Sequence, residues 1–110
     1  MQSYQGSFTE LIEVDRPVLV EFSAEWCGPC RAMVPILREV AAELRGQADV
    51  VAIDVDQNSD LSHQLDIHSL PTFLLFQNGK VLWRQAGMQS AHAIVRSINL
   101  ALEAPSLDLS

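Results

Sequence analysis

Cysteine is scarce in this chain. The 110 residues contain only two, Cys27 and Cys30, which lie three positions apart. A disulfide that stabilises a fold usually joins distant segments, because the stabilisation grows with the length of the loop that it closes. A bridge between such near neighbours would restrain almost nothing, so we do not expect a structural role for this pair.

Basic residues and long apolar runs are also lacking. Seven Lys and Arg stand against 14 Asp and Glu, which gives a formal net charge of −7. Without a basic stripe to attract phosphate groups, neither nucleic acid nor an anionic membrane is expected as a partner. No apolar stretch approaches the length of a membrane span, and residues 1–7 lack the basic and apolar regions of an export signal. We therefore expect a cytoplasmic protein, in which a CxxC pair is more often catalytic than structural.

The composition that is present fits one ordinary domain. Apolar residues make up 48% of the chain, which supports a single core, and a chain of this length buries roughly 65% of its unfolded surface. We expect one domain over residues 1–110. Pro105 is expected to separate a short tail, residues 104–110, from the last helix.

The two cysteines lie where an apolar strand is expected to give way to a helix. Residues 18–22 form a short apolar run typical of a buried strand, and apolar residues recur at helical spacing from Arg31 onward, between Met33 and Leu44. Cys27 is therefore expected at the N-terminus of the helix, with Cys30 one turn inside. The partial positive charge at that end favours a thiolate, the attacking species in thiol–disulfide exchange, and a second thiol can resolve the mixed disulfide.

The residues around the pair favour redox chemistry over metal binding. Pro29 suits the first turn of a helix, where its missing N–H costs nothing, and Gly28 is expected to leave Cys27 uncovered. A closed zinc site would need two more ligands at short spacing. The remaining candidates do not have that spacing: His63, His68 and His92. We expect no metal.

The segment 20–31, VEFSAEWCGPCR, resembles the active-site segment of the thioredoxin family. Further matches follow in the same order, and the resemblance runs from about Phe8 to about Glu103. They are Pro35 within the helix, Asp54-Val55-Asp56, Leu70-Pro71-Thr72, Asn78-Gly79-Lys80 and Gly87. The resemblance implies an α/β thioredoxin fold, with a central mixed β-sheet flanked by helices on both faces.

The order of elements is expected to be βα units followed by a hairpin. A short helix over Phe8–Ile12 precedes the strand at 18–22, and the cysteine helix continues, kinked at Pro35, to about Arg45. The later elements are a strand at 50–55, a brief helix through Gln64 with Ser59 or Asp60 as N-cap, strands at 72–76 and 81–85 joined by a turn at 77–80, and a last helix capped by Ser90.

The resemblance also implies a substrate-binding surface. Pro71 would be a cis proline beside the cysteines, although the sequence alone leaves its isomer open, and the backbone of Leu70 would pair with an extended substrate. Gly87 would leave room on another side. The implied surface comprises Trp26, Gly28, Pro29, Leu70, Pro71 and Gly87. Read alone, Trp26 fits a half-buried packing residue equally well.

Glu21 departs from the common pattern of the family. Most thioredoxins carry Asp here, beneath the second cysteine, where it is thought to relay a proton. A buried carboxylate is costly unless it is paired, and the position where the family often has a lysine is Ala52. Burial without a cation should raise the pKa of Glu21. The alternative is that Glu21 points outward at the strand edge and has no role.

Two other departures concern the surroundings of the cysteines. Ser23 stands where a tryptophan is common, and His68 stands three residues before Pro71. His68 is interpreted either as a group near the cysteines that titrates near neutral pH or as a solvated loop residue.

These observations predict a monomeric protein-disulfide reductase. Cys27 would attack the substrate sulfur, Cys30 would resolve the mixed disulfide, and Glu21 would assist proton transfer at Cys30. No cofactor is expected on the chain itself, and a separate thioredoxin reductase would supply electrons to it for reducing protein disulfides. The alternatives are a disulfide oxidase or isomerase of the same fold, and a non-catalytic thioredoxin-like subunit that docks on a larger enzyme.

Overall fold

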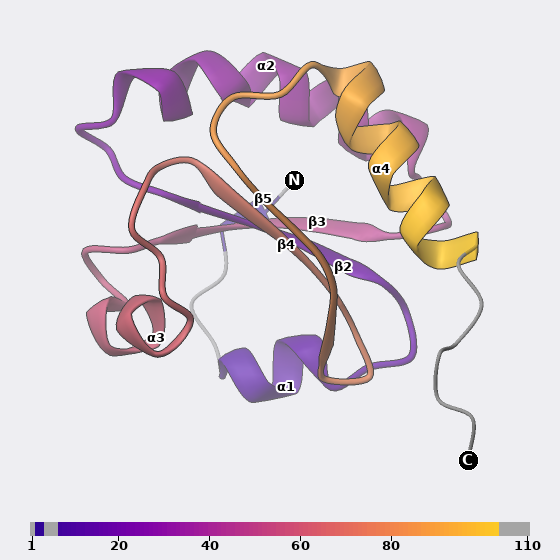
Figure 1. Cartoon of the computed structure of the whole chain (residues 1–110), viewed down its shortest axis with the longest axis horizontal. Helices are drawn as coiled ribbons and strands as arrows, with labels where there is room; N and C mark the ends of the chain where they lie inside the picture. The colour runs from indigo at the N-terminus through magenta and orange to yellow at the C-terminus, as the bar shows by residue number, and fades with distance from the viewer. Residues whose placement is uncertain (1, 4–6, 104–110) are drawn as a thin grey trace.

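The computed structural model describes residues 2–3 and 7–103, which form one five-stranded sheet with helices on both faces (Figure 1). The tail expected at 104–110 lies outside the described residues. The elements in chain order are β1 (Gln2–Ser3), α1 (Phe8–Ile12), β2 (Val18–Ser23), α2 (Gly28–Glu43), β3 (Asp49–Asp54), α3 (Ser59–Gln64), β4 (Thr72–Gln77), β5 (Lys80–Ala86) and α4 (Ala91–Glu103).

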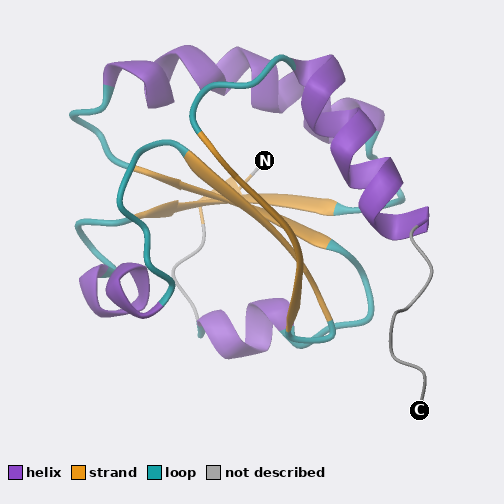
Figure 2. Ribbon diagram, in the orientation of Figure 1, coloured by secondary structure: helices purple, strands orange, loops and turns teal. Residues whose placement is uncertain are grey.

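The sheet is mixed, with strand order β1-β3-β2-β4-β5. β3 runs parallel to β2 and β1, whereas β4 is antiparallel to both β2 and β5. The central strands β2 and β4 are buried along almost their whole length, because each is covered on both faces. Helices α2 and α4 lie on one face and α1 and α3 on the other, as Figure 2 shows. The α/β thioredoxin fold expected from the resemblance is therefore confirmed.

Two apolar layers fill the space between the sheet and its helices. On the α2 and α4 side, residues such as Leu19, Leu37 and Ile98 are fully buried. On the opposite side, Val20 and Phe22 pack among residues from α1, α3 and the neighbouring strands. Alternate residues of β2 thus enter opposite layers, as strand geometry requires.

Most predicted boundaries agree with the structure to within a few residues. Helix α2 continues through Pro35, as the apolar spacing predicts, and ends before Gly46, whose φ is +83°. The predicted N-cap of α3 is wrong: Asn58 occupies that position, and Ser59 and Asp60 lie in the first turn. Strand β1 was not predicted, because two residues carry no periodic pattern.

The β4–β5 hairpin closes as its turn residues predict. Asn78 and Gly79 have φ values of +53° and +77°, which Asn and Gly adopt most readily. The tip is also tied to the segment after α1, because the Asn78 amide donates to the carbonyl oxygen of Val14 at 2.9 Å and the Gly79 amide to that of Ile12 at 3.0 Å. Ser90 accepts a hydrogen bond from the Ala93 amide at 3.0 Å and so caps α4, as predicted.

None of the helices within residues 7–103 has the length and apolar character that crossing a membrane requires.

Candidate active site

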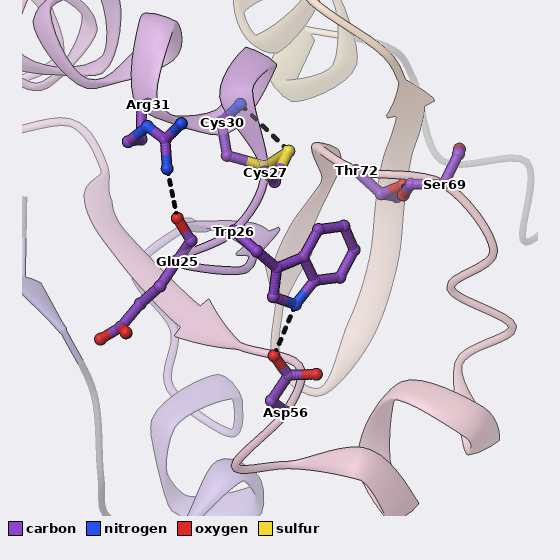
Figure 3. The surroundings of a disulfide bond; sticks show 8 residues. All are labelled: Glu25, Trp26, Cys27, Cys30, Arg31, Asp56, Ser69 and Thr72. Atoms are coloured by element: carbon purple, nitrogen blue, oxygen red, sulfur yellow. Dashed lines mark hydrogen bonds between the residues drawn. A yellow bond between two sulfur atoms is a disulfide. The ribbon is translucent and has the colours of Figure 1, made fainter.

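Cys27 and Cys30 form a disulfide at the point where the chain leaves β2 and enters α2 (Figure 3). Cys27 is the N-cap of α2, Pro29 lies in the first turn, and the two Cα atoms are 5.3 Å apart. The amide of Cys30 donates a hydrogen bond to the Cys27 Sγ at 3.2 Å. The placement predicted from the strand-to-helix pattern is confirmed.

The electrostatics at Cys27 favour a negative charge on its sulfur. The first turn of α2, all of which the structure describes, carries no acidic side chain. The free N–H groups and the dipole of a helix N-terminus stabilise an anion there by about 0.3–1 kcal/mol at exposed sites and by more where the site is partly buried. Once the disulfide is reduced, Cys27 therefore has the surroundings of a reactive thiolate.

A groove of about 470 Å³ lies against Cys27. Its lining residues come from the turn before α2 and the first turn of α2, from the position just after β3, and from the loop before β4: Trp26, Cys27, Gly28, Pro29, Val55, Ile67, His68, Ser69 and Leu70. Cys27 lines this groove and Cys30 does not. The expectation that Gly28 leaves Cys27 uncovered is wrong in extent, because Cys27 is only 5% exposed and Cys30 4%. The two cysteines differ in their relation to the groove, which Cys27 lines and Cys30 does not.

Trp26 stands out from the surface beside the disulfide. Its side chain is 67% exposed, and its indole N–H donates to an Asp56 carboxylate oxygen at 2.7 Å, as Figure 3 shows. The reading of Trp26 as a half-buried packing residue is therefore wrong. The indole ring is held upright as one wall of the groove.

The opposite wall is the loop that leads into β4. The Leu70–Pro71 peptide bond is cis, as the resemblance implies, and Pro71 itself is buried. The Thr72 hydroxyl donates to the carbonyl oxygen of Ser69 at 2.6 Å, and the Gly87 amide donates to that of Pro71 at 2.8 Å. Leu70 lines the groove, whereas Pro71 and Gly87 do not.

Gly87 meets a requirement of the backbone. Its φ is +90°, a conformation that other residues rarely adopt. A Cβ added at this position would have no described atom within 4 Å. The space around this position is therefore open, and the expectation that Gly87 leaves room for a substrate stays a prediction.

Glu21 lies on β2 and is 3% exposed, so the alternative of an outward-pointing side chain is wrong. Its neighbours across the sheet are Ala52 on β3 and Phe73 on β4, neither of which carries a charge. The Oε2 atom has no hydrogen-bond partner among the described residues. Burial raises the pKa of Glu21 from 4.5 to about 7, because removal from water disfavours the charged form.

The sequence missed part of the groove. Ile67 and Ser69 line it but carry no reactive group, and only their position just before Leu70 could have indicated them. His68 also lines the groove, and its side chain is 81% exposed, so it is a solvated loop residue that lies near Cys27. His63 and His92 are exposed elsewhere, on α3 and α4. Among residues 7–103 no three His, Cys, Asp or Glu side chains are grouped to hold a metal ion.

Comparison with known proteins gives a consistent assignment. The family model described as Thioredoxin matches residues 1–100. Thioredoxin Y, chloroplastic, from Oryza sativa subsp. japonica is 45% identical over 99 residues, which are 89% of this chain and 59% of the rice protein. Thioredoxin from Rickettsia felis is 39% identical over 93 residues, which are 84% of this chain and 89% of that protein.

A solved structure agrees with these relatives. The crystal structure of chloroplastic thioredoxin z superposes with a TM-score of 0.82 at 32% identity and covers 94% of this chain and 95% of that one. The family match extends over the fold, the disulfide at the start of α2 and the cis proline beside it. The chain belongs to the thioredoxin family, whose members are thiol–disulfide oxidoreductases.

Proposed function

We propose that this protein reduces protein disulfides by two-step exchange, with Cys27 as the attacking thiol and Cys30 as the resolving thiol. The observation that carries this assignment is the groove, which reaches Cys27 at the helix N-terminus and not Cys30. A thiolate must contact the substrate sulfur to attack it, and the groove beside Cys27 supports the assignment of that role to Cys27.

The proposed thiol–disulfide exchange takes place in two steps. The Cys27 thiolate attacks one sulfur of the substrate disulfide and forms a mixed disulfide, and the other substrate sulfur leaves as a thiolate and takes up a proton. Cys30 then loses its proton and attacks the Cys27 Sγ, which releases the second substrate thiol. Two electrons pass to the substrate, and the protein is left with the Cys27–Cys30 bridge seen here.

Glu21 is proposed to accept the proton of Cys30 in the second step. Its burial on β2, the absence of a cation at Ala52 and a pKa near 7 support this role. A general base is most effective when its pKa lies near the working pH, because it is then both available and basic enough.

The groove suits an extended segment of a substrate protein. Trp26 on one wall, Leu70 on the other and Gly28 with Pro29 at the base offer apolar surface around Cys27. We propose that these residues, with Pro71 and Gly87 supporting the loop, bind the chain on either side of the substrate disulfide.

Electrons would come from a separate thioredoxin reductase, with no cofactor held by this chain. The proposed unit is a monomeric single domain. The rice relative is named as chloroplastic, so a cytoplasmic location is a proposal that fractionation of the source cells would test.

Brief alkylation near neutral pH followed by peptide mapping tests the two roles. The reduced protein should be labelled first at Cys27, and faster labelling of Cys30 would overturn the assignment. The reduction potential against a glutathione buffer tests the direction of the reaction, since a value near or above that of disulfide oxidases would indicate an oxidase. A docking subunit would show no turnover of protein disulfides at all.

A further inference from the structure

We propose that Arg84 is a positioning residue that holds one wall of the groove and thereby sets the affinity for protein substrates. This inference rests on the proposed function. We call residues 65–70, between α3 and the cis proline, the groove loop. Arg84 Nη1 donates to the carbonyl oxygen of Leu65 and Nη2 to that of Asp66, each at 2.5 Å.

The two carbonyls that Arg84 binds lie where the chain leaves α3. Leu65 is the C-cap of α3, and the last carbonyls of a helix have no partner within the helix. Asp66 has a φ of +55°, in the left-handed region that Asp adopts more readily than most residues other than glycine. The amides of Asp66 and Ile67 donate to the carbonyl oxygens of His63 and Ser62, and so satisfy the N–H groups of this turn. The guanidinium of Arg84 binds carbonyl oxygens of the same turn.

The groove loop supplies four of the nine residues that line the groove: Ile67, His68, Ser69 and Leu70. Its far end is fixed by hydrogen bonds from Thr72 to Ser69 and from Gly87 to Pro71. Its near end is fixed by Arg84. All three donors belong to the β4–β5 hairpin or follow it directly, so the hairpin holds the loop at both ends.

A lysine could not replace Arg84 fully. Two donors in one plane, at fixed separation, match two successive carbonyl oxygens, whereas an ammonium group is a single point at the end of a flexible chain. Arg84 does not line the groove, so its effect on substrate must pass through the loop. If the groove loop is displaced for part of the time, the apparent affinity for substrate equals the intrinsic affinity multiplied by the fraction of molecules whose loop is in place.

The test compares Arg84→Met and Arg84→Lys with the parent. Insulin, with excess dithiothreitol as reductant, serves as the protein disulfide, and 5,5′-dithiobis(2-nitrobenzoic acid) serves as a small disulfide that does not need the loop. Arg84→Met should raise KM for insulin roughly three- to tenfold with kcat little changed. The KM of Arg84→Lys for insulin should lie between the values of the parent and of Arg84→Met. The rate with the small disulfide should stay within about twofold of the parent.

The matched control is Arg16→Met. Arg16 also donates two hydrogen bonds from an exposed guanidinium, to Asp49, but it precedes β2 at the end of the sheet away from the groove. Its removal should leave KM for insulin unchanged. Hydrogen exchange should accelerate at residues 66–70 in Arg84→Met and not in Arg16→Met.

An unchanged KM in Arg84→Met, or an equal fall in the rates with insulin and the small disulfide, would overturn the proposal. If the parent itself fails to reduce insulin, the proposed function is wrong. The hydrogen-exchange comparison then still decides whether Arg84 holds the loop.

Discussion

Replacing Glu21 with glutamine should stabilise the protein, relative to the parent, progressively more as the pH rises from acid to alkaline. The amide has nearly the shape of the carboxyl group but cannot ionise. Glu21 is 3% exposed, its cross-strand neighbours Ala52 and Phe73 carry no charge, and its Oε2 lacks a hydrogen-bond partner among the described residues. Ionisation in the folded state is therefore penalised, which raises the pKa to about 7.

The direction and the size of this change in stability follow from the linkage between folding and protonation of Glu21. Below the unfolded-state pKa of 4.5, Glu21 is protonated in both states and contributes no pH dependence. As pH rises from there to about 7, the unfolded state loses its proton first, so the parent is progressively destabilised. At about 1.4 kcal/mol per pKa unit, the full effect is roughly 3 kcal/mol and is complete above pH 7.

The assay is urea denaturation of the oxidised proteins, followed by circular dichroism, at about pH 4 to about pH 8. The amide leaves its own buried N–H₂ group without an evident partner, at a cost of about 1–3 kcal/mol at every pH. We therefore compare the free energy of unfolding of the variant with that of the parent at each pH. The informative result is how this difference changes with pH. We expect that difference to rise in favour of Glu21→Gln by about 3 kcal/mol over this range.

The control is Glu39→Gln, which removes an exposed carboxylate on α2. The difference in free energy of unfolding between Glu39→Gln and the parent should stay constant across the same pH range. A flat difference for Glu21→Gln as well would refute the reasoning, because the folded-state pKa would then equal the unfolded one. Under the proposed mechanism, Glu21→Gln should also slow the resolving step while it stabilises the fold.

Three further predictions concern the site. Cys30→Ser should accumulate mixed disulfides with substrate proteins on non-reducing gels, whereas Cys27→Ser should form none; equal turnover by both variants would contradict the exchange mechanism. Ala52→Lys should place an ammonium group beside Glu21, lower its pKa from about 7 and shift the pH profile of activity downward, which carboxyl NMR titration would detect. Gly87→Ala should cost about 1–2 kcal/mol in urea denaturation because its φ is +90°, and an unchanged midpoint would show that the backbone relaxes there.

Local patterns predicted most of the fold. The buried strand β2, the cysteine helix and the Asn78-Gly79 turn each depend on residues close together in sequence. Strand β1 exists only through its pairing with β3, a contact between distant segments, and so left no local signal. The N-cap of α3 was misplaced because Asn58, Ser59 and Asp60 are all good capping residues.

The site divides in the same way. The sequence predicted the reactive pair because both cysteines lie in one segment. It also indicated Glu21, because a charged residue is unusual in an apolar strand. The cis form of Pro71 came only from family resemblance, since the residues alone favour trans. The groove loop and its tie to Arg84 join segments about 20 residues apart, which no periodicity reports.

The tethered tip of the β4–β5 hairpin limits where the chain can be engineered. Tight two-residue turns are common choices for inserting a tag or a reporter, but here the amides of Asn78 and Gly79 hold the segment after α1. The bend at Gly46, between α2 and β3, is a better site for such an insertion. Its residues are exposed, their backbone bonds stay within the bend, and a Cβ at Gly46 would have no described atom within 4 Å.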